Sequence, residues 1–258
     1  MSSPRVLVTG AAGGVASMLL PGLRDSWRLV LTDRVPVPGG LVGDLTDPDF
    51  VARITEGVDA VVHLAACPDP NASWDELRTA NVEVVATLLA AGVPRVVLAS
   101  SAHVMGQYAR TGRVPIDPDS PVAPCCPYGA TKAFAEALGR VFAYRTGASV
   151  IVLRLGATTP EPPASSALSG WLGPADLHQL VSRALVADVG YAVCAGVSAN
   201  TRTIWDTRNT IGYEPVLDSE AYAHQVPDDD GWGLCAPRGD VGRRGVRSPK
   251  ATDSGPRG

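Results

Sequence analysis

Short apolar runs alternate with longer amphipathic stretches along most of the chain. The apolar runs are typical of strands in a parallel sheet, because such strands are covered on both faces and stay apolar throughout. We therefore predict strands at residues 5–9, 29–32, 60–64, 95–100 and 149–154, with a less regular one at 191–194.

Between these runs, apolar residues recur at the spacing of an amphipathic helix. Helices are predicted to begin near Gly13 and to cover residues 73–91, 128–145 and 174–186. Gly147 gives the third of them a C-terminal stop, and Pro174 suits the first turn of the last. Strands that alternate with helices predict βαβ units, and hence an α/β fold with a Rossmann-like, doubly wound parallel sheet.

The length of 258 residues and the hydrophobic content of 45% suit one sizeable domain, which we place at residues 1–225. After residue 226 the composition changes to an acidic run, several glycines and prolines, and few large apolar side chains. We expect residues 226–258 to form a loosely ordered tail.

The net charge and the length of the apolar runs bear on which kinds of partner the protein binds. The formal net charge is −4 and no basic run occurs, which gives no reason to expect nucleic acid. No apolar run approaches the roughly eighteen residues of a membrane span, and glycines interrupt the N-terminal apolar stretch before it resembles a signal peptide. We expect a cytoplasmic protein that acts on a small molecule, with no membrane or nucleic acid partner.

The five cysteines are scattered, and none lies in a Cys-x-x-Cys or Cys/His spacing typical of zinc. The adjacent pair Cys125 and Cys126 cannot hold a metal alone. We therefore expect reduced thiols and no metal site.

A glycine-rich loop, VTGAAGGVA at residues 8–16, follows the first predicted strand and opens a helix. Gly10 permits a tight turn, Gly13 lets the backbone approach a pyrophosphate, and Ala16 lets helix and strand pack closely. The helix N-terminus offers free N–H groups and a positive dipole end to phosphates. The loop indicates a dinucleotide site, with a plain flexible turn as the alternative.

An acidic residue follows at a suggestive distance. Asp33 ends the second predicted strand, at the spacing at which a carboxylate reaches the adenosine ribose hydroxyls. A carboxylate there repels a 2′-phosphate, which favours NAD over NADP. Arg34 complicates this preference, because an arginine binds such a phosphate or stacks on adenine.

Two further segments are candidates for cofactor contacts. Asp44 and Leu45 stand where a third strand would end, and they indicate either an adenine pocket or a helix cap or turn around Asp44–Asp47. The small residues of Leu64-Ala65-Ala66 close the fourth predicted strand, either against a cofactor or in tight packing.

Tyr128 and Lys132 lie four residues apart, on one face of a predicted helix. A free tyrosine has a pKa near 10, and a neighbouring ammonium lowers that pKa by favouring the phenolate. Ser100 and Ser101 end a predicted parallel strand, at the sheet edge that binds ligands. A hydroxyl there can hold a substrate oxygen while Tyr128 takes its proton. The combination favours a nicotinamide-dependent oxidoreductase over a solvated helical pair.

These motifs resemble the extended short-chain dehydrogenases/reductases of the NAD-dependent epimerase/dehydratase family, most closely the bacterial uronate dehydrogenases, over residues 4–225. The resemblance implies a short substrate-facing part at about 155–225 and a homodimer formed through helices 73–91 and 128–145. It is carried by VTGAAGGVA, Asp33, HLAA at 63–66, Asn81, LASSAHVMG at 98–106, YGATK at 128–132, RLGATTPEP at 154–162 with LRLG at 153–156, and VSANTRTIWD at 197–206 followed by GYEP.

The resemblance also implies roles for single residues. Ser101 matches the catalytic serine, Tyr128 the base and Lys132 its partner. Asn81 would support the cofactor or the local helix, unless it is an ordinary surface amide. The expected cofactor-binding residues are Gly10, Ala12, Gly13, Gly14, Val15, Asp33, Arg34, Asp44, Leu45, Leu64, Ala65, Ala66, Asn81, Ser100, Tyr128 and Lys132.

Three positions depart from the uronate dehydrogenases. The arginine that clamps the sugar carboxylate is replaced by Ser166, a substrate-binding serine by Ala157, and an asparagine after the catalytic serine by Ala102. Without a bidentate arginine, a carboxylated sugar loses its main recognition group. The expected substrate-facing residues are Asp69, Ser101, His103 and Ala157.

The candidates for replacement substrate contacts are His103, Asp69, Asn71 and Arg202, and each has a structural alternative. Asp69 and Asn71 lie in a proline-flanked loop and suit a turn. His103 is otherwise a structural histidine, and Arg202 is otherwise the ion-pair partner of Asp206 or another carboxylate. Trp205 is expected in the core.

We expect an NAD-dependent dehydrogenase that acts on a sugar or sugar-like polyol; by resemblance, oxidation at an anomeric carbon gives a lactone. One alternative is an NAD-dependent sugar epimerase or dehydratase that recycles its cofactor internally. Another is a non-catalytic NAD-binding sensor, which would not need Ser101, Tyr128 and Lys132 together.

Overall fold

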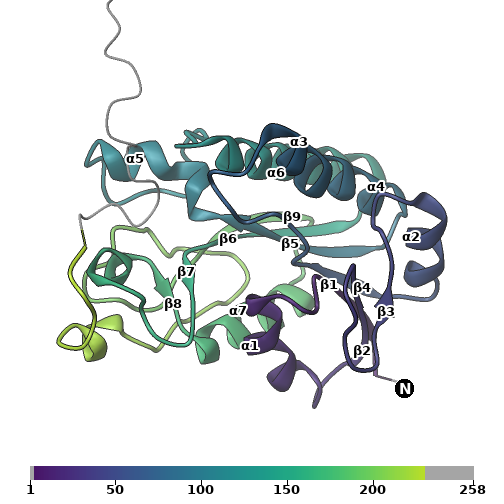
Figure 1. The fold of residues 1–258 in the computed structure, drawn as a ribbon, viewed down its shortest axis with the longest axis horizontal. Helices are drawn as coiled ribbons and strands as arrows, with labels where there is room; N and C mark the ends of the chain where they lie inside the picture. The colour runs from purple at the N-terminus through teal and green to yellow at the C-terminus, as the bar shows by residue number, and fades with distance from the viewer. Residues whose placement is uncertain (1–2, 230–258) are drawn as a thin grey trace, which may run out of the picture.

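A computed structural model describes residues 3–229 of the chain. Its main feature is a seven-stranded parallel sheet in the order β3-β2-β1-β4-β5-β6-β9 (Figure 1). The predicted Rossmann-like α/β fold is therefore confirmed. The strands are β1 (Arg5–Thr9), β2 (Arg28–Asp33), β3 (Leu41–Val42), β4 (Ala60–His63), β5 (Arg95–Ser101), β6 (Ser149–Leu155) and β9 (Tyr191–Gly196).

Helices cover both faces of the sheet (Figure 1). On one face lie α1 (Gly14–Leu23) and α7 (Pro174–Val186), and on the other lie α2 (Pro48–Thr55), α4 (Val84–Ala90) and α6 (Pro127–Thr146). Successive side chains of β1 point to opposite faces of the sheet. Val6 and Val8 pack in the core with α1 and α7, and Leu7 packs in the core with α2 and α4. This two-sided burial explains why the strand is apolar at successive positions.

The predicted helix at 73–91 is helical throughout but not uniform. It begins with a capping box between Ser73 and Glu76 and divides into α3 (Trp74–Leu77), a π-helical segment η1 (Arg78–Glu83) and α4. A π-helical turn within an α-helix often marks a functional site, and this one carries Asn81.

Some boundaries differ from the prediction. The third strand, β3, has two exposed residues and ends at Val42, so the prediction of a strand end at Asp44 and Leu45 is wrong. Such a short, exposed edge strand leaves almost no apolar pattern. The helix α2 was not predicted as an element, but Asp47 is its N-cap, as the helix-cap alternative for Asp44–Asp47 implies. The Asp47 carboxylate accepts the N–H of Asp49 at 2.9 Å.

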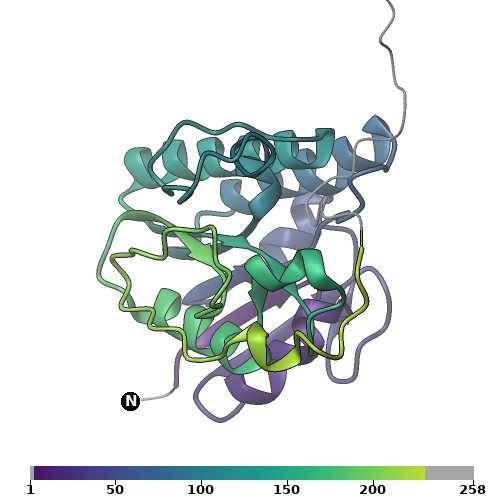
Figure 2. The same cartoon turned by 90° about the vertical axis from the view of Figure 1, so that its left-hand side faces the viewer.

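The C-terminal part forms a lobe beside the carboxyl ends of the large sheet (Figures 1 and 2). It contains a two-stranded sheet of β7 (Ala157–Thr158) and β8 (Trp171–Leu172), with the short helices η3 (Ser165–Ser169) and η4 (Ser219–Tyr222). Trp205 is buried, as predicted.

Residues 230–258 of the predicted tail lie outside the described residues. Among residues 3–229, no helix is both long and apolar enough to cross a membrane.

Candidate functional site

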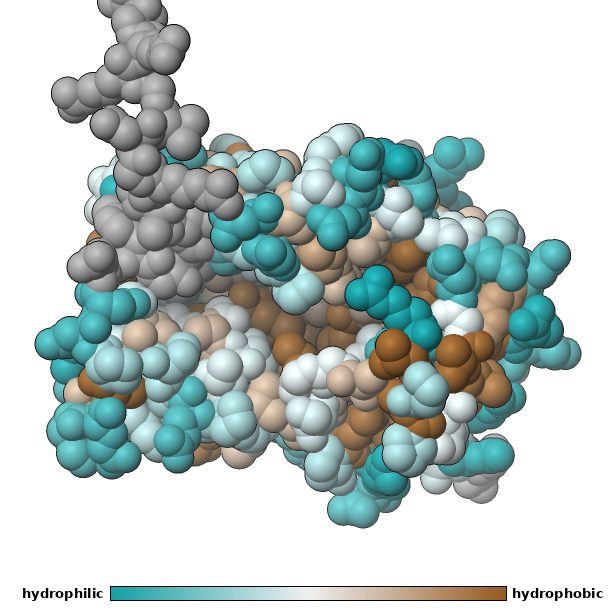
Figure 3. Space-filling model, in the orientation of Figure 1, coloured by the Kyte–Doolittle hydropathy of each residue, from teal (hydrophilic) through white to brown (hydrophobic). Residues whose placement is uncertain are grey.

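The candidate site lies at the carboxyl edge of the sheet, where the chain leaves β1, β4 and β5. The strand order reverses between β1 and β4, and doubly wound sheets bind ligands at such a switch point. The space-filling view in Figure 3 shows a hollow with an apolar floor between the upper helical part and the lower part of the molecule.

The glycine-rich loop makes a tight turn at this edge. Gly10 has φ 69°, and a side chain there would collide with the backbone of Leu64 and Ala65. Gly13 is the N-cap of α1, the first turn of α1 carries no acidic residue, and a side chain at Gly14 would point into open space. No side chain caps the helix N-terminus, so its N–H groups fit a bound pyrophosphate.

Asp33 lies directly beside this loop. Its Oδ2 atom accepts the N–H of Ala12 at 3.0 Å, and its Oδ1 atom accepts the N–H of Val35 at 3.2 Å. The structure thus brings the glycine-rich loop, which follows β1, next to Asp33 at the end of β2. A carboxylate fixed there is suited to ribose hydroxyls.

Asp44 forms the turn that the sequence analysis held as its alternative. Its Oδ1 atom accepts both the N–H and the hydroxyl of Thr46 at 2.8 Å. These hydrogen bonds lower the pKa of Asp44, and the charge of the exposed Arg34 contributes in the same direction. The contacts with the adenosine part of the cofactor expected for Asp44, Leu45 and Arg34 stay predictions.

The end of β4 is tied to β1 through one threonine. Thr9 Oγ1 lies 2.8 Å from His63 Nδ1 and accepts the N–H of Ala65 at 3.3 Å. Burial, aided by the charge of Lys132, lowers the pKa of His63 to about 3, so this histidine stays neutral at physiological pH. Leu64, Ala65 and Ala66 are half-buried.

Asn81 is buried, so the surface-amide alternative is wrong. Its Oδ1 atom accepts the N–H of Cys67 at 2.8 Å, while its Nδ2 group donates to Cys67 O at 3.1 Å and to Thr131 Oγ1 at 3.0 Å. Asn81 therefore ties the loop after β4 to α6, next to Lys132.

Tyr128 and Lys132 project from successive turns of α6, and both are buried. Lys132 Nζ lies 5.8 Å from the centre of the Tyr128 ring and donates to Ala99 O at 2.9 Å. Burial lowers the pKa of Lys132 to about 8. Burial also raises the pKa of Tyr128, while a hydrogen bond with Ser101 acts in the opposite direction. The pKa of Tyr128 was expected to be lowered by Lys132. It is raised instead, because desolvation of the buried phenol is the largest effect.

The two serines at the end of β5 point to different partners. Ser101 forms the hydrogen bond with Tyr128, and its Oγ atom accepts the N–H of His103 at 3.2 Å. Ser100 Oγ donates to Glu136 Oε1 at 2.6 Å. Successive residues of β5, from Ala99 to Ser101, therefore each bond to a different turn of α6.

Glu136 and Arg154 are functional candidates that the sequence analysis missed. Arg154 donates to both Glu136 oxygens, at 3.0 and 2.8 Å, and both side chains are buried. The third guanidinium nitrogen, Nη1, donates to Pro118 O at 2.9 Å. A glutamate one turn after Lys132 on the same helix face was the available signal.

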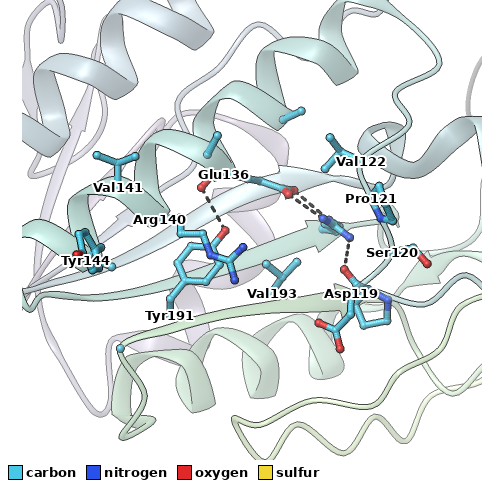
Figure 4. Close-up of a pocket in the computed structure, with 16 residues that line it drawn as sticks. Asp119, Ser120, Pro121, Val122, Glu136, Arg140, Val141, Tyr144, Tyr191 and Val193 are labelled. Atoms are coloured by element: carbon cyan, nitrogen blue, oxygen red, sulfur yellow. Dashed lines mark hydrogen bonds and ion pairs between the residues drawn. The ribbon is translucent and has the colours of Figure 1, made fainter.

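This ion pair forms one wall of a cavity of about 870 Å³ on the outer side of α6 (Figure 4). Arg140 and Tyr191 also line it, with the guanidinium 4.9 Å from the ring centre. Neither the glycine-rich loop nor Tyr128 contributes to its lining. The cavity is therefore separate from the candidate cofactor site.

The predicted substrate-facing residues are distributed unevenly. His103 is half-buried, and its ring meets that of Tyr128 edge-on at 5.4 Å. Asp69 is exposed and accepts the N–H of Asn71 at 2.7 Å, as the turn alternative requires. Ala157 is half-buried in β7.

Arg202 has a structural partner. Its guanidinium donates to both carboxylate oxygens of Glu220, at 2.7 and 2.8 Å. Asp206, the partner considered from the sequence, instead accepts from Arg208 Nε at 2.7 Å.

Ser166, at the position of the missing arginine, contacts an acidic residue. Its hydroxyl donates to Asp229 Oδ2 at 2.5 Å, and its N–H donates to Oδ1 at 3.0 Å. Ser165 also donates to this carboxylate, at 3.2 Å. Both serines at the position expected for the carboxylate clamp therefore bond to a carboxylate.

Comparisons with known proteins agree with this geometry. The model of the NAD dependent epimerase/dehydratase family matches residues 6–161. A uronate dehydrogenase from Pseudomonas syringae pv. tomato is 35% identical, over 88% of this chain and 88% of its own length. An NAD-dependent glucose-6-phosphate dehydrogenase from Haloferax volcanii is 31% identical, over 85% of this chain and 96% of its own.

A solved structure is also similar. It is a mutant uronate dehydrogenase from Agrobacterium tumefaciens in complex with NAD. It superposes with a TM-score of 0.82 at 29% identity, and the match covers 92% of this chain and 98% of that one.

Proposed function

Because the chain belongs to the NAD-dependent epimerase/dehydratase family, we propose that it is an NAD-dependent dehydrogenase that interconverts a hydroxyl and a carbonyl of a sugar or sugar-like polyol. The observation that carries the proposal is the meeting of Ser101, Tyr128 and Lys132 at the sheet edge that also bears the glycine-rich loop. A sensor would have no need of this proton-transfer group.

The cofactor is assigned to residues of the first half of the chain. The N-terminus of α1, with Gly10 to Val15, would hold the pyrophosphate, and Asp33 the adenosine ribose. Arg34, Asp44 and Leu45 would border the adenine, and Leu64 to Ala66 with Ser100 the middle of the cofactor. Asn81 would act through the loop that it fixes, and Lys132 would bond the nicotinamide ribose.

The protein's own residues would manage the proton. Tyr128 takes it from the substrate hydroxyl, while Ser101 holds the same oxygen. When bound, NAD supplies the hydride acceptor and a positive ring charge. Lys132 is oriented by Ala99 O, and its ammonium favours the phenolate as Tyr128 loses its proton. Burial excludes water, which strengthens these interactions.

The lobe favours a neutral substrate over a carboxylated one. Asp229 bonds to Ser165 and Ser166, and no arginine stands at Ser166 to clamp a carboxylate. His103, Asp69 and Ala157 are the side chains that we assign to the substrate together with Ser101. The similar proteins reported above are named for two different sugars, a uronate and a sugar phosphate, so substrate recognition differs among relatives of this chain.

The test is NADH formation, followed by its absorbance, with purified protein, NAD and a panel of uronates, neutral aldoses and polyols. We expect activity on a neutral sugar and little on uronates. A failure on every compound, combined with NAD that stays bound through purification, would replace the proposal with an internally recycling epimerase or dehydratase.

We further propose a cytoplasmic homodimer in which residues 1–225 act as one domain. The exposed face of α6 carries Phe134, Val141 and Tyr144, the last at 90% exposure, and Trp74 at the start of α3 is also exposed. Large apolar side chains in such a position favour a helix-to-helix interface. A stable monomer at micromolar concentration, measured by light scattering, would exclude the dimer.

A further inference from the structure

We propose that His103, Cys125 and Cys126 form a binding site for a thiophilic divalent cation of the zinc type. The Nδ1 atom of His103 lies 3.3 Å from Cys126 Sγ and 3.6 Å from Cys125 Sγ. All three ligand atoms lie within 4.8 Å of one another. The sequence analysis dismissed the cysteine pair because a pair alone cannot hold a metal, and the fold brings in the third ligand from 22 residues away.

The distances match the requirements of the ion. A tetrahedral zinc ion with Zn–S bonds of about 2.3 Å and a Zn–N bond of about 2.1 Å separates sulfur from nitrogen by about 3.6 Å. The two separations in this structure lie close to that value, so an ion can enter with little rearrangement. Two sulfurs and one imidazole form a soft donor set, which favours zinc over magnesium or calcium.

The backbone around the cluster is built to hold these side chains together. Cys125 donates its N–H to His103 O at 3.2 Å, so the two ligand segments run side by side. Gly106 leaves the space that Cys125 Sγ occupies, and a side chain at Gly129 would collide with His103 O. Two glycines therefore permit the close approach of the ligands.

The start of α6 fixes the place of the ligand Cys126. Cys126 is the N-cap of α6, a helix of 20 residues, and its Sγ atom accepts the N–H of Gly129 at 3.4 Å. The N-terminal end of a helix dipole stabilises a negative charge. All three ligands are half-buried, so the site is shielded but reachable.

Three protein ligands leave the fourth position of a tetrahedral ion for water or another donor. The site would adjoin the proposed catalytic group. The His103 ring contacts that of Tyr128, and the backbone N–H of His103 donates to Ser101 Oγ. The binding is nevertheless a property of the three ligands. It can be measured whether or not the dehydrogenase activity is found.

The experiment uses the full chain without a histidine tag, reduced and treated with a chelator, and titrated with Co²⁺. We expect one equivalent to bind with thiolate-to-cobalt charge-transfer bands and the intense visible bands of a tetrahedral ion, and Zn²⁺ to abolish both. Cys126→Ser and His103→Gln should each weaken binding by more than about 10-fold, since even an outer-shell partner of a metal contributes that much.

Cys67→Ser and Cys194→Ala are the matched controls, because each removes one described thiol outside the cluster. Both should bind Co²⁺ like the unmodified protein, and circular dichroism should show that every variant is folded. The proposal is overturned if the unmodified protein shows no thiolate–cobalt bands, or if Cys126→Ser and His103→Gln both bind as tightly as the controls.

Discussion

The two ends of the candidate site are held together by different kinds of interaction. On the cofactor side, buried strands, a glycine at φ 69° and backbone N–H groups set the shape. In the lobe from β7 onward, many contacts are exposed side-chain pairs, such as Arg202 with Glu220 and Ser166 with Asp229. Where backbone geometry shapes a site, few residue types are allowed at each position. An exposed pair of side chains can be replaced by another pair. The cofactor side can therefore be read from the sequence, whereas the substrate side cannot.

The largest expected effect comes from the residue that both sides share. Tyr128→Phe removes the proposed base, and we expect kcat to fall by about 10²–10⁴-fold, the usual contribution of general base catalysis. NAD affinity, measured by fluorescence quenching, should change little. Tyr144→Phe on the exposed face of the same helix is the control. Undiminished turnover in Tyr128→Phe would remove Tyr128 from the mechanism.

The second prediction compares a buried ion pair with an exposed one. Glu136→Gln leaves the buried Arg154 without its charged partner, and we expect a loss of about 3–5 kcal/mol in the free energy of unfolding. Glu220→Gln breaks the exposed pair with Arg202 and should lower the free energy of unfolding far less, because solvent screens this pair. Denaturant unfolding measures both, and equal losses would contradict the proposed difference between the regions.

The third prediction concerns the cofactor side alone. Asp33→Asn removes the charge that repels a 2′-phosphate, so KM for NAD should rise about 10-fold while the preference for NAD over NADP shrinks. Substrate selectivity should be unchanged. Asp44→Asn, at the carboxylate used in a turn, should leave the cofactor preference intact. An unaltered preference in Asp33→Asn would assign the discrimination to another residue.

The smallest effect is expected on the substrate side. Ser166→Arg should raise kcat/KM for a uronate by less than about 10-fold, because Asp229 remains to neutralise the new guanidinium. Combining it with Asp229→Asn should raise uronate activity further. Ser166→Met controls for side-chain length. If Ser166→Met raised uronate activity as much as Ser166→Arg, charge would not be the cause.

The sequence analysis succeeded where local rules determine the outcome. The apolar strands, the glycine-rich loop and the capping of α6 by Gly147 each follow from backbone requirements. It failed where the outcome depends on residues distant in the chain. The burial of Asn81 by Cys67 and Thr131 is one example, and the raised pKa of Tyr128, which depends on the surrounding packing, is another.

Charged residues in the core were the hardest to predict. The position of Glu136 one turn after Lys132 was the only local signal, and it does not reveal that the partners of Glu136 are Ser100 of β5 and Arg154 of β6. In the same way, His103 becomes a candidate metal ligand only when the segment before α6 folds against η2 (Ala102–Met105). Pairings of this kind require the three-dimensional structure.

The three-point attachment of β5 to α6 has a consequence for how such an enzyme changes over generations. Ala99, Ser100 and Ser101 are each bonded to a different turn of one helix, so displacing any one of them disturbs the other two. The proposed proton-transfer group is thus constrained as a unit, while the lobe lies outside this attachment. New substrates can then be acquired by mutation in the lobe without passing through inactive intermediates.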